Sequence, residues 1–60
     1  MIPDERGDNK MVKNIPNYAK VYKYIVARYA DGGWWFYGAY YSEEKAIAVA
    51  TEINGIVVYQ

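Results

Sequence analysis

The 60-residue chain contains no cysteine and no histidine. The first absence excludes disulfides and thiolate metal ligands, and the second removes the commonest metal ligand and the commonest general base. A chain of this length forms at most one domain and usually needs a disulfide, a metal or a second subunit for stability. We therefore expect the fold to be stabilised by oligomerisation or by an unusually dense aromatic core.

Net charge is also lacking, because seven basic residues balance seven acidic ones. This balance disfavours sequence-independent binding to duplex nucleic acid, which needs an excess of Lys and Arg. The sequence has no apolar run of membrane-spanning length, and residues 1–10 show no apolar stretch of the signal-peptide kind. We therefore expect a cytoplasmic protein that does not enter a membrane.

Catalytic groupings are missing as well. Glu43 and Glu44 are adjacent in an expected helix, where neighbouring side chains point apart, and Ser42 has no nearby base in the sequence. The glycines after Asp31 lack the spacing of a phosphate-binding loop and are better interpreted as a turn. We expect no enzyme activity, no cofactor and no metal site.

The first third of the chain differs from the rest. Residues 1–19 hold both prolines and are predicted to be a flexible or extended segment, disordered up to about Lys10, and residues 20–60 are predicted to form a single domain. Within that domain two aromatic, β-branched stretches around Asp31-Gly32-Gly33 predict a hairpin, with strands at Val21–Tyr29 and Trp34–Tyr41.

A helix and a last strand follow the hairpin. Ser42 is a preferred N-cap, apolar residues recur at helical spacing from Glu43 to Ile53, and Gly55 is expected to end the helix in a left-handed conformation. Ile56–Tyr59 is a short third strand. The fold class is therefore α+β with the order ββαβ, a helix on one sheet face and the strand order 2-1-3, in which the last strand is antiparallel to the first.

Alternation along the strands divides the hairpin into two faces if its turn has two residues, whereas a three-residue loop would exchange the partnership. We expect the helix to cover the slimmer face, which carries Lys23, Ile25, Ala27, Tyr29, Trp34, Phe36, Gly38 and Tyr40. The other face would then be open unless residues 11–18 fold back over it. Its aromatic and basic side chains are the predicted partner-binding residues: Tyr22, Tyr24, Arg28, Trp35, Tyr37 and Tyr41.

These residues indicate a non-catalytic protein-interaction module, such as a small adaptor or inhibitor. The alternatives are a structural homodimer without external ligand and, third, a binder of single-stranded nucleic acid that stacks bases on its aromatic rings.

The stretch from Lys23 to Tyr59 resembles small orphan accessory proteins encoded by phages and mobile elements of Gram-positive bacteria. The resemblance is one of style, carried by Tyr24-Ile25-Val26-Ala27-Arg28, by Asp31-Gly32-Gly33-Trp34-Trp35 and by the helix start at Ser42–Lys45. It implies an accessory protein that binds a host or phage protein, and it assigns no functional residues.

Overall fold

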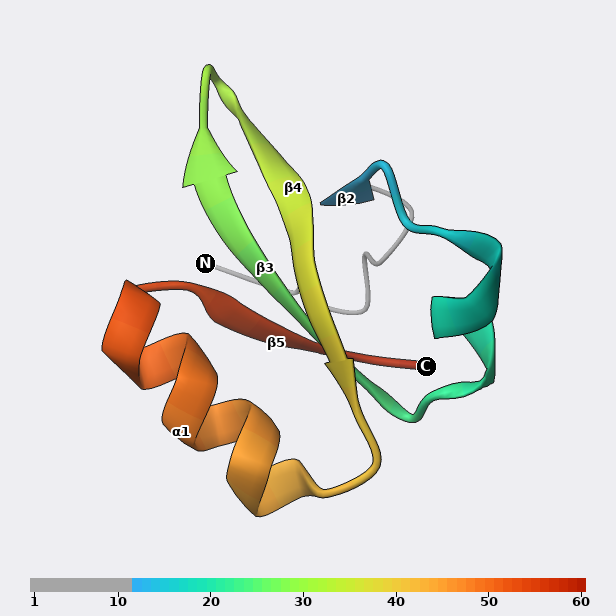
Figure 1. Cartoon of the computed structure of the whole chain (residues 1–60). Coiled ribbons are helices and arrows are strands. Elements are labelled where there is room, and N and C mark those ends of the chain that lie inside the picture. The colour runs from blue at the N-terminus through green and yellow to red at the C-terminus, as the bar shows by residue number, and fades with distance from the viewer. Residues whose placement is uncertain (1–11) are drawn as a thin grey trace.

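A computed structural model describes residues 12–60 (Figure 1). The described elements are β2 (Val12–Lys13), the short 3-10 helix η2 (Asn17–Val21), β3 (Tyr24–Ala30), β4 (Gly33–Tyr40), α1 (Glu43–Ile53) and β5 (Ile56–Tyr59). The prediction of disorder up to Lys10 lies outside these residues. The predicted helix and last strand have the expected bounds, whereas both hairpin strands differ from expectation by one to three residues at their ends.

The β3–β4 hairpin is the longest feature of the fold and extends beyond the other elements at its turn (Figure 1). Ala30 pairs with Gly33, so the turn consists of Asp31 and Gly32 alone. Both turn residues have positive φ, 50° at Asp31 and 77° at Gly32, as a type I′ turn requires. The expected two-residue turn is therefore present.

A β-bulge interrupts the hairpin and changes its faces. Val26 pairs with Gly38 and Ala27 pairs with Phe36, which leaves Tyr37 without a partner on β3. Near the turn, the side chains of β3 and β4 share sheet faces as expected. Beyond the bulge, Gly38 and Tyr40 lie on the same face as Val26 rather than on the face of Ile25. The sequence-based face assignment is wrong for this half of β4, because it assumed unbroken alternation.

The sheet confirms the α+β class but has four strands in the order β2-β4-β3-β5. The three expected strands are adjacent with β3 at their centre, and β5 is antiparallel to β3. The predicted order 2-1-3 is incomplete, because β2 lies parallel to β4 on its outer side. This extra strand comes from residues that we had expected to lie outside the folded domain.

Helix α1 has defined caps at both ends. The Ser42 hydroxyl accepts a hydrogen bond from the Lys45 N–H over 3.2 Å. At the other end Asn54 is left-handed, with φ 60°, and the Gly55 N–H donates to the Ala50 carbonyl over 2.7 Å. This pattern is a Schellman motif, in which the residue before Gly55 takes the left-handed conformation. The expectation that Gly55 itself is left-handed is wrong.

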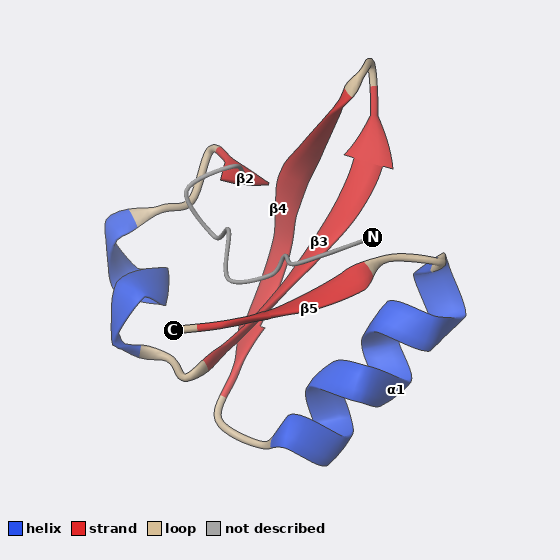
Figure 2. Ribbon diagram, turned by 180° about the vertical axis from the view of Figure 1, so that it is seen from behind, coloured by secondary structure: helices blue, strands red, loops and turns tan. Residues whose placement is uncertain are grey.

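Both faces of the sheet are covered, each by a different segment (Figure 2). Helix α1 packs through Ala46 and Ala50 against Val26, which is fully buried. Ile25, fully buried on the opposite face, packs in a cluster with Val12 and Ala19 from the N-terminal segment. The helix therefore covers the face that we had expected to be open, and residues 12–21 cover the face assigned to the helix.

Candidate functional site

The six predicted partner-binding residues lie at three separate places. Tyr24 packs beneath the helix, Tyr22 and Tyr41 stack on each other, and the remaining three residues line a pocket on the hairpin. The continuous patch inferred from the sequence is thus divided by α1, because the helix occupies the middle of the face on which the patch was placed.

Tyr24 belongs to the contact between helix and sheet. Its ring meets that of Tyr59 edge to face, with 5.5 Å between the ring centroids. The Tyr59 hydroxyl in turn donates a hydrogen bond of 2.7 Å to Oε2 of Glu43 in the first turn of α1. This pair connects the end of β5 to the start of the helix and shows which flank of α1 faces β5.

The bond between Tyr59 and Glu43 predicts a dependence of stability on alkaline pH. The hydrogen bond to Glu43 raises the pKa of Tyr59 above its ordinary value of 10.0, with burial and the nearby carboxylate charge acting in the same direction. The unfolded chain therefore loses the Tyr59 proton first. The stabilisation is complete below the unfolded-state pKa and is lost as pH rises through the folded-state pKa. In urea denaturation, the wild type should exceed Tyr59→Phe in free energy of unfolding at neutral pH. The difference should disappear as the pH rises from the unfolded-state pKa of Tyr59 through its folded-state pKa. Parallel pH profiles would contradict the bond.

The second location is a tyrosine cluster at the end of the hairpin away from its turn. The rings of Tyr22 and Tyr41 stack with 4.3 Å between centroids, and Tyr18 meets Tyr22 edge to face. Charge repulsion from Tyr22 raises the pKa of Tyr41 above its ordinary value. Tyr18 and Tyr41 are 63% and 72% exposed, so much of this cluster faces solvent. Tyr18 was missed by sequence reasoning, because it lay in a segment expected to be extended.

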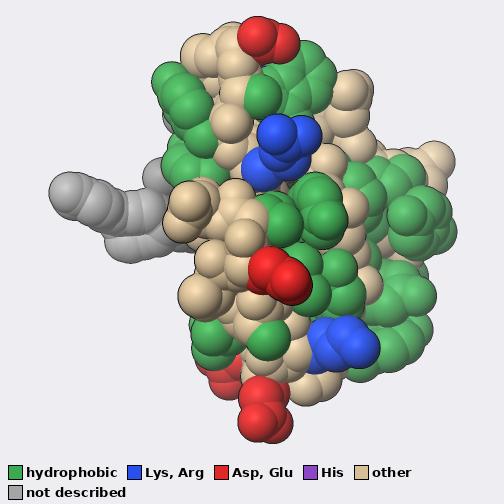
Figure 3. Space-filling model, turned by 60° about the vertical axis from the view of Figure 1, so that its left-hand side comes forward, with side chains coloured by type: hydrophobic (Ala, Val, Ile, Leu, Met, Phe, Trp, Pro, Cys, Tyr) green, Lys and Arg blue, Asp and Glu red, His purple; other side chains and the backbone are tan. Residues whose placement is uncertain are grey.

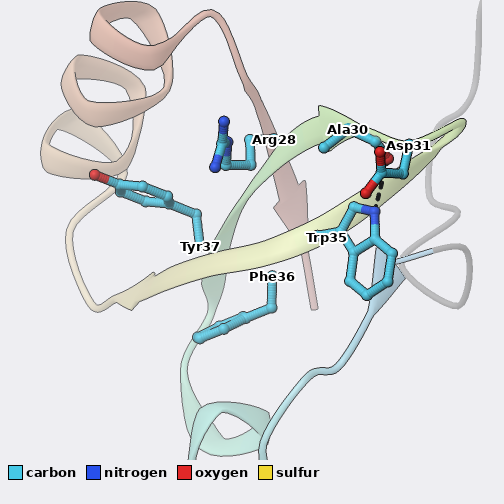
Figure 4. Close-up of a pocket in the computed structure, with 6 residues that line it drawn as sticks. All are labelled: Arg28, Ala30, Asp31, Trp35, Phe36 and Tyr37. Carbon is cyan, nitrogen blue, oxygen red and sulfur yellow. Dashed lines mark hydrogen bonds between the residues drawn. The ribbon is translucent and has the colours of Figure 1, made fainter.

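The third location is an open pocket of about 370 Å³ near the hairpin turn. Its lining consists of Arg28, Ala30, Asp31, Trp35, Phe36 and Tyr37 (Figure 4). Arg28 and Tyr37 project from the same side of the hairpin, and Phe36 projects from the opposite side. Tyr37 takes this position because the bulge releases it from the pairing with β3, and half of its surface is exposed.

Trp35 is held in place at this pocket. Its indole Nε1 donates a hydrogen bond of 2.7 Å to the Ala30 carbonyl, and the Lys13 Nζ lies 5.3 Å from the ring centroid. The Ala30 bond is the only hydrogen bond drawn among the six lining residues, so Arg28 and Asp31 do not pair with each other (Figure 4). Lys13 therefore lies near the indole, and Arg28, which is exposed and lines the same pocket, is open to an incoming group.

The surface seen from the helix side mixes apolar and charged side chains. Hydrophobic and tyrosine side chains gather along one side of this face, with single basic and acidic groups between them (Figure 3). Within residues 12–60 there is no group of three or more acidic side chains that could hold a metal ion.

Neither helix of the described part of the chain is long and apolar enough to cross a membrane. Fold and site together define a small α+β domain with an aromatic pocket, lined also by Arg28 and Asp31, on a projecting hairpin. No protein-family model matches the chain, and no curated protein or solved structure matches it significantly.

Proposed function

We propose that this chain is a non-catalytic protein-interaction module that binds an extended peptide segment of a partner protein at the hairpin pocket. The observation that carries the proposal is that Arg28, Trp35 and Tyr37 line one open pocket. Tyr, Trp and Arg are the side chains most enriched among residues that dominate binding energy at protein interfaces.

The position of the pocket supports this function. Strand β5 pairs with β3 only from Tyr24 to Ala27, so the part of the hairpin that carries Arg28 projects past β5. The projecting hairpin is nevertheless rigid, since Trp35 is bound to Ala30 and β2 pairs with β4 at Trp34 and Trp35. A preorganised projecting surface loses little conformational freedom when a ligand binds.

The chemistry of the pocket selects its occupant. A volume of about 370 Å³ is near the lower limit for a small-ligand site and fits one or two side chains of a peptide. Arg28 presents donors for a carboxylate, and Lys13 adds positive charge beside Trp35. The Trp35, Phe36 and Tyr37 rings give the lining its apolar surface, and Asp31 is its one acidic residue. We therefore expect a peptide in which a glutamate or aspartate adjoins an aromatic residue.

Titration with short blocked peptides tests this function. The indole N–H resonance of Trp35 reports on the pocket, and we expect it to shift saturably with a Glu-Phe peptide. Peptides with Lys-Phe and Glu-Ala should bind at least several-fold more weakly, because each lacks one of the two complementary groups. Binding in the millimolar range is expected, since one or two side chains supply only a few kcal/mol.

Two variants and a control make the test specific. Arg28→Gln should remove the preference for Glu-Phe over Lys-Phe, and Tyr37→Ala should weaken every aromatic peptide. Tyr29→Ala is the matched control, because Tyr29 is an exposed aromatic residue of the same hairpin that packs on Trp34 outside the pocket. The proposal fails if no peptide shifts the indole resonance, or if binding maps instead to the tyrosine cluster and favours single-stranded oligonucleotides.

A further inference from the structure

Strand β5 forms one edge of the sheet, and no strand from residues 12–60 pairs with its outer side. The direction of its backbone groups follows from the Gln60 N–H, which donates to the Lys23 carbonyl over 2.9 Å. Because antiparallel pairing alternates, the groups of Ile56 and Val58 also point to β3. The N–H and C=O groups of Val57 and Tyr59 therefore point outward.

These outward groups are complementary to those of a second β5 in the antiparallel direction. If the two-fold axis passes beside Val58, each Val57 faces the partner's Tyr59, and the two such pairs exchange four backbone hydrogen bonds. In the same register Val58 meets the partner's Val58, and Ile56 meets the partner's Gln60. The alignment uses every outward backbone group between residues 57 and 59.

The side chains next to this edge fit the same partner. Ile56–Gln60 contains no charged residue and no proline, which are the usual means by which an edge strand avoids pairing. Glu43 is bound to Tyr59, so the flank of α1 that carries Glu43 faces β5. Ile47 lies one turn further along that flank and is 46% exposed. An apolar strip thus runs from α1 to the edge.

We infer that a second copy of this chain binds at β5, forming an antiparallel β5–β5 dimer with a continuous sheet and with the two α1 helices side by side. A second copy fits because the backbone groups of the edge are complementary to themselves and Ile56–Gln60 carries no charged side chain. The small size of the domain also makes added burial valuable for stability. This interface is separate from the hairpin pocket, so both surfaces act independently.

Light scattering on the full chain during size-exclusion chromatography should give twice the mass of one chain. This mass should fall to that of a single chain on dilution.

A chain of 60 residues is accessible to chemical synthesis, so N-methylation of Tyr59 can remove one outward N–H without changing a side chain. Two of the four intermolecular hydrogen bonds are then lost. The dimer dissociation constant should rise about 100-fold, at roughly tenfold for each bond. The bond between Tyr59 and Glu43 stays available, so circular dichroism should still report a folded chain.

A second variant tests the helix flank. Ile47→Lys places like charges across the axis and should weaken the dimer, whereas Ala48→Lys, on the exposed side of α1, should not. In a mixture of isotope-labelled and unlabelled protein, we expect a contact between the Val58 Hα atoms of the two copies.

Three results would overturn the inference. The first is a monomer at every concentration, which is expected if another segment of the same chain occupies the edge. The second is a dimer that N-methylation of Tyr59 does not weaken. The third is a set of intermolecular contacts at the tyrosine cluster instead of at Val58.

Discussion

Replacing Gly55 by valine should remove a large part of the free energy of unfolding of the chain. A Cβ atom at this position would lie 2.3 Å from the Ala27 carbonyl oxygen and 3.2 Å from Cδ1 of Ile53. The carbonyl belongs to the central strand β3, which is held on both sides by β4 and β5 and cannot move away. Overpacking of this kind costs about 1–3 kcal/mol, and a domain of this size is rarely stabilised by more than roughly 3–5 kcal/mol.

Gly33→Ala provides the matched control for this prediction. Its added Cβ would meet only the end of the flexible Lys13 side chain, at 3.2 Å. Urea denaturation followed by circular dichroism should therefore show Gly33→Ala within about 0.5 kcal/mol of the wild type. A Gly55→Val variant as stable as Gly33→Ala would mean that β5 does not approach β3 as described.

The same glycine shows where sequence reasoning succeeds and where it stops. The Asn54-Gly55 pair correctly predicted the end of α1, because both residue types tolerate positive φ. The pair could not show which of the two takes that conformation. Asn54 does, and Gly55 is needed for the close passage of β5 past Ala27. That requirement is a tertiary contact, which no local pattern records.

The faces of the hairpin illustrate a second limit. The Asp31-Gly32 turn could be recognised because a type I′ turn needs positive φ at two successive residues. The bulge at Tyr37 could not, since its sequence surroundings resemble an unbroken aromatic strand. One inserted residue moves every later side chain to the other face. The predicted site residues near the turn therefore share a pocket, whereas those beyond the bulge lie elsewhere.

The N-terminal segment was underestimated for a compositional reason. Its asparagines and Pro16 are typical of extended or irregular chain, and only scattered apolar residues interrupt them. Val12, Ile15 and Ala19 nevertheless contact the sheet, and side-chain Nε2 of Gln60 donates to the Ala19 carbonyl over 3.1 Å. Irregular segments can cover a core with a few well-placed side chains, and such coverage leaves no periodic signal.

Truncating Ile25 to alanine is expected to have the other large effect, because this residue joins the segment 12–21 to the sheet. Ile25 is fully buried in the cluster formed with Val12, Ala19 and Val58. Removing its outer carbons takes away buried apolar surface and leaves a cavity that neighbouring alanines cannot fill. Such a change costs about 2–5 kcal/mol, which is comparable to the whole stability of a domain this small.

Val21→Ala is the control for Ile25→Ala, since Val21 is a β-branched residue of the covering segment that is 74% exposed. Its loss should change the free energy of unfolding by no more than about 0.5 kcal/mol. Tryptophan fluorescence during urea denaturation suits both variants, because Trp34 packs against the same cluster. If Ile25→Ala were as stable as Val21→Ala, residues 12–21 would not cover this face. Ile25 would then be exposed, and the apolar surface open to a partner would lie there rather than at the hairpin pocket.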